Sequence, residues 1–128
     1  LTMKSDAIVE LSLHPPYVQR GVLSLELHPM MAVFLFALYR LPEGEKLTLS
    51  QTVQTIEAAG WEYPGDLAMK QQIQQLRQAM RKLEVDNPVL FVNGGWMLNS
   101  HLRWEAADEE NEMDLLDVIY TGLLPHSR

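Results

Sequence analysis

The chain has no cysteine among its 128 residues, which excludes disulfides, thiolate metal ligands and cysteine nucleophiles. Long hydrophobic runs are also missing: the longest, Met30–Leu38, has nine residues, whereas a membrane-spanning helix needs roughly 20. The glycines form neither a Gly-x-Gly-x-x-Gly motif nor a Gly-Lys-Ser/Thr motif, so nothing indicates a nucleotide site. These absences favour a cytoplasmic protein with no membrane partner and no nucleotide cofactor.

Catalytic and metal-binding patterns are equally scarce. The histidines have no metal-ligand spacing, which favours core, capping or surface roles for His14, His28, His101 and His126. The carboxylates between Asp108 and Asp114 lack the glycine and the ligand spacing of an EF-hand loop, so a solvated acidic segment is the preferred interpretation. We therefore expect no metal, no cofactor and no enzyme activity.

The net charge of −7 is distributed unevenly along the chain. Residues 1–104 hold nine Lys/Arg and ten Asp/Glu, whereas residues 105–128 hold seven Asp/Glu and one Arg. The acidity therefore belongs mainly to the C-terminal segment, and the nearly neutral remainder still allows a local basic face. With 47% hydrophobic residues, the chain is expected to form one domain with its own core.

The N-terminal half predicts a sheet followed by two helices. Apolar and polar residues alternate over 7–13 and 21–27, which is typical of half-buried strands. Pro15 and Pro16 should end the first strand, because proline has no N–H to donate; we expect an antiparallel sheet over 7–27. Pro29 opens a helix to about residue 41 that is apolar on nearly all sides and hence buried.

A second helix is expected over about 49–59. Thr48 and Gln51 have the spacing of a capping box. Helical periodicity would then place four residues on the face that points to the core: Leu49, Val53, Ile56 and Gly60.

A third helix and a hairpin complete the predicted order. Asp66 is a good N-cap for a helix over 66–84, and an apolar stripe recurs at helical spacing at Met69, Ile73, Leu76, Met80 and Leu83. Asn87-Pro88 should end this helix. The turn Asn93-Gly94-Gly95 between two apolar runs then predicts a hairpin over 89–99.

Sheet, three helices and hairpin in this order resemble a winged helix-turn-helix, specifically the DNA-binding domain of OmpR/PhoB-type response regulators. Thr48–Gln51 resembles the family's Ser-x-x-Gln, and 73–80 resembles Ile-x-x-Leu-Arg-x-x-Leu. Residues 92–98 are similar to the closing Val-Arg-Gly-x-Gly-Tyr-x-Leu, one residue short and with Asn93 in place of Arg. Gln also stands where relatives often have Arg, and the chain has no receiver domain. The resemblance implies an α+β winged-helix domain over 1–104.

This family binds double-stranded DNA, with the recognition helix in the major groove and the wing on the backbone. Helix 66–84 carries four cations and two acids, and Gln and Arg pair well with adenine and guanine edges. The candidate DNA-binding residues are Lys70, Gln71, Gln74, Gln75, Arg77, Gln78, Arg81, Lys82 and Asn93. Among these, Gln71, Gln74 and Gln75 are the expected base readers. The alternative to DNA binding is that this face is simply a solvated helix surface. For Asn93, the alternative is a turn residue with no role in binding.

We expect Arg77 and Arg81 to approach DNA from the flanks of the helix, so that replacing both would leave thermal unfolding nearly unchanged. The resemblance thus indicates a sequence-specific DNA-binding domain of a bacterial transcriptional regulator. The alternative is a winged-helix module for protein–protein interaction that does not bind DNA. Three aromatic residues could serve a phosphate contact or a partner surface, namely Trp61, Tyr63 and Trp96, although core packing is favoured for Trp96.

The segment 105–128 is expected to be an acidic extension with an amphipathic helix over about 112–121. Met113, Leu116 and Tyr120 would share one face of that helix. This stripe could pack back on the body of the protein, or it could form a homodimer or bind a partner protein.

Overall fold

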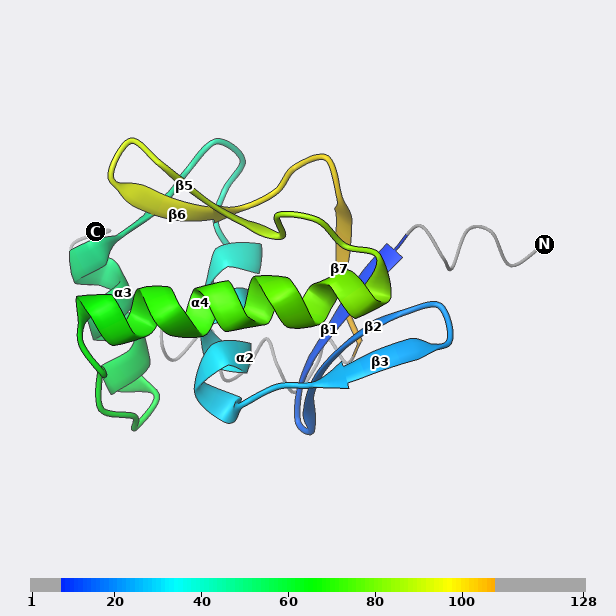
Figure 1. Cartoon of the computed structure of the whole chain (residues 1–128). Helices are drawn as coiled ribbons and strands as arrows, with labels where there is room; N and C mark the ends of the chain where they lie inside the picture. The colour runs from blue at the N-terminus through cyan, green and yellow to red at the C-terminus, as the bar shows by residue number, and fades with distance from the viewer. Residues whose placement is uncertain (1–7, 108–128) are drawn as a thin grey trace.

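A computed structural model describes residues 8–107 as an α+β fold with three α-helices and two β-sheets (Figure 1). The expectation of a mixed α+β fold is confirmed. The helix expected over 112–121, its stripe Met113, Leu116 and Tyr120, and residues 1–7 lie outside the described residues.

Sheet A has the strand order β3-β2-β1-β7. Its antiparallel part comprises β1 (Ile8–Leu13), β2 (Pro16–Arg20) and β3 (Leu23–Glu26). The prediction of only two strands here was wrong: Pro15 and Pro16 indicated a connection, whereas the residues from Pro16 to Arg20 pair with β1 as a further strand. Pro16 pairs with Leu13 as the first residue of β2, a position that a strand allows to proline. The segment expected over 21–27 is shortened to β3, since residues 21–22 form the turn.

The fourth strand, β7 (Arg103–Ala106), lies parallel to β1, with Val9 opposite Trp104 and Leu11 opposite Ala106. The sheet is therefore mixed rather than antiparallel. The folded part also continues through the boundary expected at residue 104, and Glu105 belongs to the sheet instead of the acidic extension. This four-residue strand, Arg-Trp-Glu-Ala, has too little alternation to be recognised in the sequence.

Helix α2 (Pro29–Tyr39) forms the centre of the core, as expected, although it ends two residues earlier than predicted. All residues from Met30 to Leu38 are buried. Val9, Leu11 and Leu13 of β1 alternate toward the interior and join the same core. The N-cap of the helix is His28, whose Nδ1 accepts a hydrogen bond from the Met30 N–H at 3.1 Å. His28 is therefore a capping histidine, one of the roles expected for it.

Helix α3 (Leu49–Ala58) begins with the predicted capping box: Thr48 Oγ1 accepts from the Gln51 N–H and Gln51 Oε1 accepts from the Thr48 N–H. Its buried face differs from the prediction. Thr52, Thr55 and Ile56 are buried, whereas Val53 is only half-buried and Gly60 is exposed. Thr52 can be buried because its hydroxyl donates to the Thr48 carbonyl at 2.8 Å, a bond that satisfies it within the helix.

Helix α4 (Asp66–Met80) continues as a 3₁₀ turn, η1 (Arg81–Leu83), and buries the whole predicted stripe from Met69 to Leu83. The N-cap is Gly65, with φ 106° and no capping side chain, so the assignment of Asp66 as the N-cap was wrong. Asp66 is instead the first helical residue. A positive φ of this size suits glycine, which has no Cβ.

Sheet B has the order β4-β6-β5 and contains the predicted hairpin, β5 (Val89–Val92) and β6 (Gly95–Leu98). Asn93 and Gly94 both have positive φ, as a two-residue type I′ turn requires. The short strand β4 (Leu47–Thr48), which was not predicted, pairs with β6. Lys46, the residue before β4, lies so close to β6 that a Cβ on Gly95 would be 2.7 Å from Lys46 Cβ.

Candidate nucleic-acid interface

The outer face of α4 and η1 gathers most of the candidate residues on one surface. Figure 1 shows α4 across the front of the molecule, with the β5–β6 hairpin along one side and sheet A toward its C-terminal end. Seven candidate side chains are exposed on it: Lys70, Gln71, Gln74, Gln75, Gln78, Arg81 and Lys82. We call these seven residues the α4 face.

The α4 face follows directly from helical geometry. At 3.6 residues per turn, the buried positions Met69, Ile73, Leu76 and Met80 share one side, so that the amides and cations between them point to the opposite side. No Asp or Glu occurs between residues 67 and 83. Leu67, at the N-terminal end of the same surface, is 71% exposed. The α4 face therefore offers hydrogen-bonding amides and positive charge without a carboxylate that would repel phosphate.

Arg77, although also a candidate DNA-binding residue, does not belong to the α4 face. Its Nη2 donates to the Val89 carbonyl of β5 at 2.8 Å and its Nη1 to Gln74 Oε1 at 3.2 Å, and the side chain is half-buried. The premise of the expectation that replacing Arg77 and Arg81 leaves thermal unfolding unchanged, a freely exposed side chain, does not hold for Arg77, because its guanidinium connects α4 to the hairpin. The sequence pattern placed Arg77 correctly beside the apolar stripe but could not show which strand lies there.

The β5–β6 hairpin carries no charged residue between Val89 and Leu98. Asn93 is exposed at the tip of the hairpin. Its positive φ shows that it serves as a turn residue, which does not depend on any contact with DNA. Phe91 and Val92 are 43% and 38% exposed. The Phe91 ring packs against Trp96 with centroids 4.6 Å apart, and Trp96 itself is buried, as favoured from the sequence. This surface is apolar rather than basic.

Sequence reasoning missed Arg20, which fixes the C-terminal end of α4. From β2, its Nη1 donates to the carbonyls of Leu83, at 3.3 Å, and Glu84. Carbonyls at the end of a helix lack partners within the helix, and a cation there also interacts favourably with the helix dipole. No local pattern could have identified this contact, because the two segments are more than 60 residues apart.

Tyr63 fixes the other end of α4. Its hydroxyl donates to Asp66 Oδ1 at 2.8 Å. Partial burial raises the pKa of Tyr63 to about 12, and the hydrogen bond to the Asp66 carboxylate and the negative charge of that carboxylate act in the same direction. The tyrosine is thus a neutral donor that orients the first turn of the helix.

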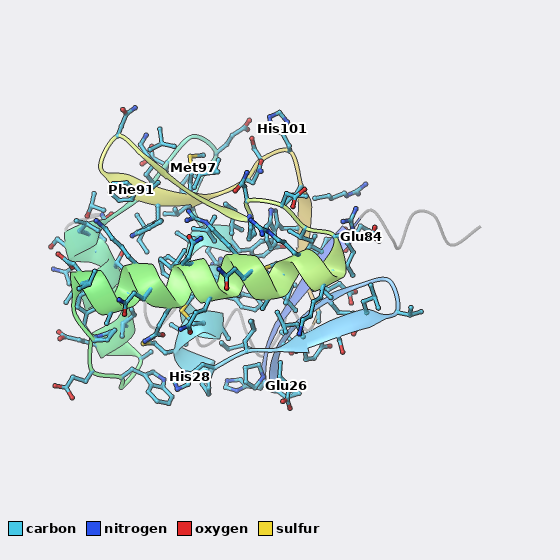
Figure 2. All side chains as sticks on the ribbon, viewed as in Figure 1. Glu26, His28, Glu84, Phe91, Met97 and His101 are labelled. Atoms are coloured by element: carbon cyan, nitrogen blue, oxygen red, sulfur yellow. The ribbon has the colours of Figure 1, made fainter. Side chains whose placement is uncertain are left out.

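Beside α4 lies a groove of about 510 Å³ between the helix, the loop before it and the start of α2. Trp61, 37% exposed, packs edge-on against His28 with ring centroids 5.0 Å apart. The lining includes Glu26 and Glu62 but neither Lys nor Arg. Figure 2 shows Glu26 and His28 on the opposite side of α4 from Phe91 and Met97. The groove therefore disfavours phosphate, in contrast to the α4 face, although Gln75 borders both.

Residues 8–107 contain no group of three or more His, Asp or Glu side chains that could hold a metal ion. Within the same range, no helix is long and apolar enough to cross a membrane.

Comparisons with protein-family models, with curated proteins and with solved structures found no match for this chain.

Proposed function

We propose that this chain is a sequence-specific DNA-binding domain of the winged helix-turn-helix type, from a bacterial transcriptional regulator, with α4 as the recognition helix. The observation that carries the proposal is the α4 face: four exposed glutamines and three exposed cations with no carboxylate among them. Amides that contact base edges and cations that contact phosphates are the two components of readout in the major groove.

The arrangement around α4 supports this proposal. Helix α3 precedes α4 through a short loop, as the first helix of a helix-turn-helix does, and the β5–β6 hairpin follows it in the position of a wing. Bonds to Val89, Leu83 and Glu84 fix α4 to the hairpin and to sheet A. A reading helix needs such rigid support, because base contacts require well-defined side-chain positions.

The charge of the α4 face sets a quantitative expectation for DNA binding. Lys70, Arg81 and Lys82 are exposed, and no acidic partner within 4 Å is found for them among residues 8–107. Each cation that neutralises one phosphate contributes about −0.9 to the slope of log K against log salt concentration. We therefore expect a slope of about −3 for the full chain on a mixed-sequence duplex.

The first experiment measures this slope by fluorescence anisotropy for the full chain and for Lys70→Ala and Lys82→Ala. Each substitution should weaken binding on all duplexes and make the slope shallower by about one. Arg103→Ala is the control, because Arg103 is an exposed cation of β7 in sheet A, outside both the α4 face and the hairpin. Equal losses in Arg103→Ala and the two α4 variants would contradict the proposed orientation.

The second experiment tests base readout with selection from a randomised duplex library. The Gln71 side chain is exposed and makes no hydrogen bond to other described residues, so Gln71→Ala changes little besides the surface. A bidentate Gln–adenine contact is worth roughly 1–3 kcal/mol of discrimination. Gln71→Ala should flatten the preference at one or two positions, whereas Gln54→Ala, an exposed glutamine of α3, should leave the profile as it is. An unchanged profile in Gln71→Ala would remove this residue from the set of readers.

The alternative function, a protein–protein interaction module that does not bind DNA, is favoured by the uncharged hairpin with its exposed Phe91 and Val92. Val92→Lys distinguishes the two functions. A hairpin that lies along the DNA backbone gains a phosphate contact from the new cation and steepens the salt slope. If the hairpin instead serves as an apolar surface for a partner protein, Val92→Lys should not strengthen any DNA binding that is measured.

A further inference from the structure

The groove that Trp61 lines has the size and the walls of a small-molecule site, and we call it the Trp61 groove. Its walls come from the end of β3 and the start of α2, from the loop before α4, and from the flank of α4 itself. Its volume of about 510 Å³ lies within the range of roughly 300–1,000 Å³ that is typical of such sites. Four of the lining residues are buried and apolar: Leu27, Met30, Met31 and Leu76.

Contacts within the chain hold these walls in place. The Trp61 N–H donates to the Ile56 carbonyl at 3.1 Å, which connects the loop before α4 to α3. His28, the N-cap of α2, accepts from the Met30 N–H and meets the Trp61 ring edge-on, with ring centroids 5.0 Å apart. A site that is already formed loses little affinity to the ordering of its own residues when a ligand binds.

Trp61 gives the groove an aromatic surface. The side chain is 37% exposed, and the edge-on contact with His28 covers at most one of the two faces of the indole ring. The face of an aromatic ring carries a negative electrostatic potential, and among aromatic side chains tryptophan attracts cations most strongly. The ring therefore favours a ligand that is positively charged.

The charge of the groove points to the same kind of ligand. Its only charged lining residues are Glu26 and Glu62, which are exposed and come from two different walls. No cation within 4 Å of either carboxylate is found among residues 8–107. His28, which lies on the same side of α4 as Glu26 (Figure 2), adds no positive charge here, because its Nδ1 acts as an acceptor and so carries no proton. Carboxylates in a concave site attract cations and repel anions.

We propose that the Trp61 groove binds a small organic cation, namely a protonated amine on an apolar body. The apolar body packs against the buried leucines and methionines, and the ammonium group lies near Trp61 and the two carboxylates. Gln72, which is half-buried and makes no hydrogen bond to other described residues, provides a further acceptor for an ammonium N–H. The ligand thus contacts α4 directly. This inference does not depend on DNA binding, and its test uses the full chain without DNA.

The first test compares three probes at pH 7 that share one apolar body and differ in charge: 4-phenylbutylammonium, 4-phenylbutanol and 4-phenylbutyrate. Binding to the full chain is followed by two-dimensional ¹H–¹⁵N NMR. We expect a Kd on the order of 1 mM for the cation and affinities about tenfold lower for the alcohol and the carboxylate. The largest shifts should occur at the amides of residues 26–31 and at the Trp61 indole N–H. Equal affinities for the three probes, or shifts centred on the β5–β6 hairpin, would overturn the proposal.

The second test changes the groove and keeps its shape. Glu26→Gln and Glu62→Gln should each weaken binding of 4-phenylbutylammonium about three- to tenfold and leave 4-phenylbutanol unaffected, and Trp61→Leu should weaken the cation to a similar extent. Glu43→Gln is the matched control, because Glu43 is an exposed carboxylate on the loop after α2 and does not line the groove. Cation binding in the three groove variants equal to that of Glu43→Gln would overturn the proposal. Binding of a basic peptide, but of none of the three probes, would assign the groove to a partner protein instead.

Discussion

Arg77 offers the sharpest test of how α4 is held, because its side chain was expected to be free and is instead bonded to β5. Its Nη2 lies 2.8 Å from the Val89 carbonyl in a half-buried position. Hydrogen bonds to charged groups contribute about 1.5–3 kcal/mol. Since the side chain remains partly solvated, we expect roughly 1–2 kcal/mol for Arg77→Met, which keeps an apolar stem but cannot donate. For a domain of this size that corresponds to a Tm lowered by about 5–15 °C.

The assay is thermal denaturation followed by far-UV circular dichroism, with Arg77→Met compared with Arg81→Ala. Arg81 is exposed and its side chain has no bond to other described residues, so its replacement should shift the free energy of unfolding by less than about 0.5 kcal/mol. If Arg77→Met unfolds at the parent temperature, the bond to Val89 contributes nothing and α4 is held by apolar packing alone. A parallel DNA titration then shows how much of any loss of affinity reflects a loosened helix.

Three further predictions concern the elements that position the α4 face. Gly95→Ala should lower Tm, because the new Cβ would lie 2.7 Å from Lys46 Cβ and 3.2 Å from the Leu47 carbonyl oxygen, and over-packing of this kind costs about 1–3 kcal/mol. Gly94→Ala serves as the comparison for backbone strain alone, because Gly94 has φ 82° and a Cβ there would meet no atom within 4 Å. Thr48→Ala should cost about 1 kcal/mol in urea denaturation through loss of the capping box, whereas Thr48→Ser should retain most of it. Tyr63 should ionise with a pKa of about 12 in a spectrophotometric titration, and Asp66→Asn should bring that pKa down toward 10.0, the tyrosine's ordinary value, but only part of the way, because burial is the larger cause. Because folding raises this pKa, Tyr63 stabilises the fold fully below pH 10, and that stabilisation should be lost as the pH rises toward 12; a Tyr63→Phe variant with the same alkaline unfolding profile would contradict this.

The sequence predicted the helices and the hairpin well because their signals are local. The nine buried residues from Met30 to Leu38, the capping box at Thr48 and the Asn93-Gly94 turn are each set by neighbours in the chain. The stripe from Met69 to Leu83 predicted which side of α4 faces the core. The exposure of its opposite side followed from the same period.

Predictions from the sequence are wrong where pairing or packing between distant segments decides the structure. Pro16 can open β2 because Leu13 of β1 provides its partner. Strand β7 forms by pairing with residues 8–11 along the edge of β1 that β2 does not occupy. Thr52 and Thr55 are buried against the centre of the fold although their side chains are polar. Arg77 and Arg20 contact carbonyls 12 and more than 60 residues away. No periodicity within one segment carries information about such contacts.

The small positive charge of the α4 face determines the kind of DNA binding that we expect. Three exposed cations and an uncharged hairpin provide little of the non-specific phosphate attraction that usually dominates affinity. Recognition by such a surface must depend more on base contacts by the glutamines, so that the ratio of specific to non-specific affinity can be high while the absolute affinity stays modest. Two such domains on adjacent half-sites would double the number of phosphate contacts and steepen the salt slope to about −5. A slope near −3 on a single site and near −5 on a tandem site would therefore indicate a domain that binds one site weakly and gains affinity when two domains bind side by side.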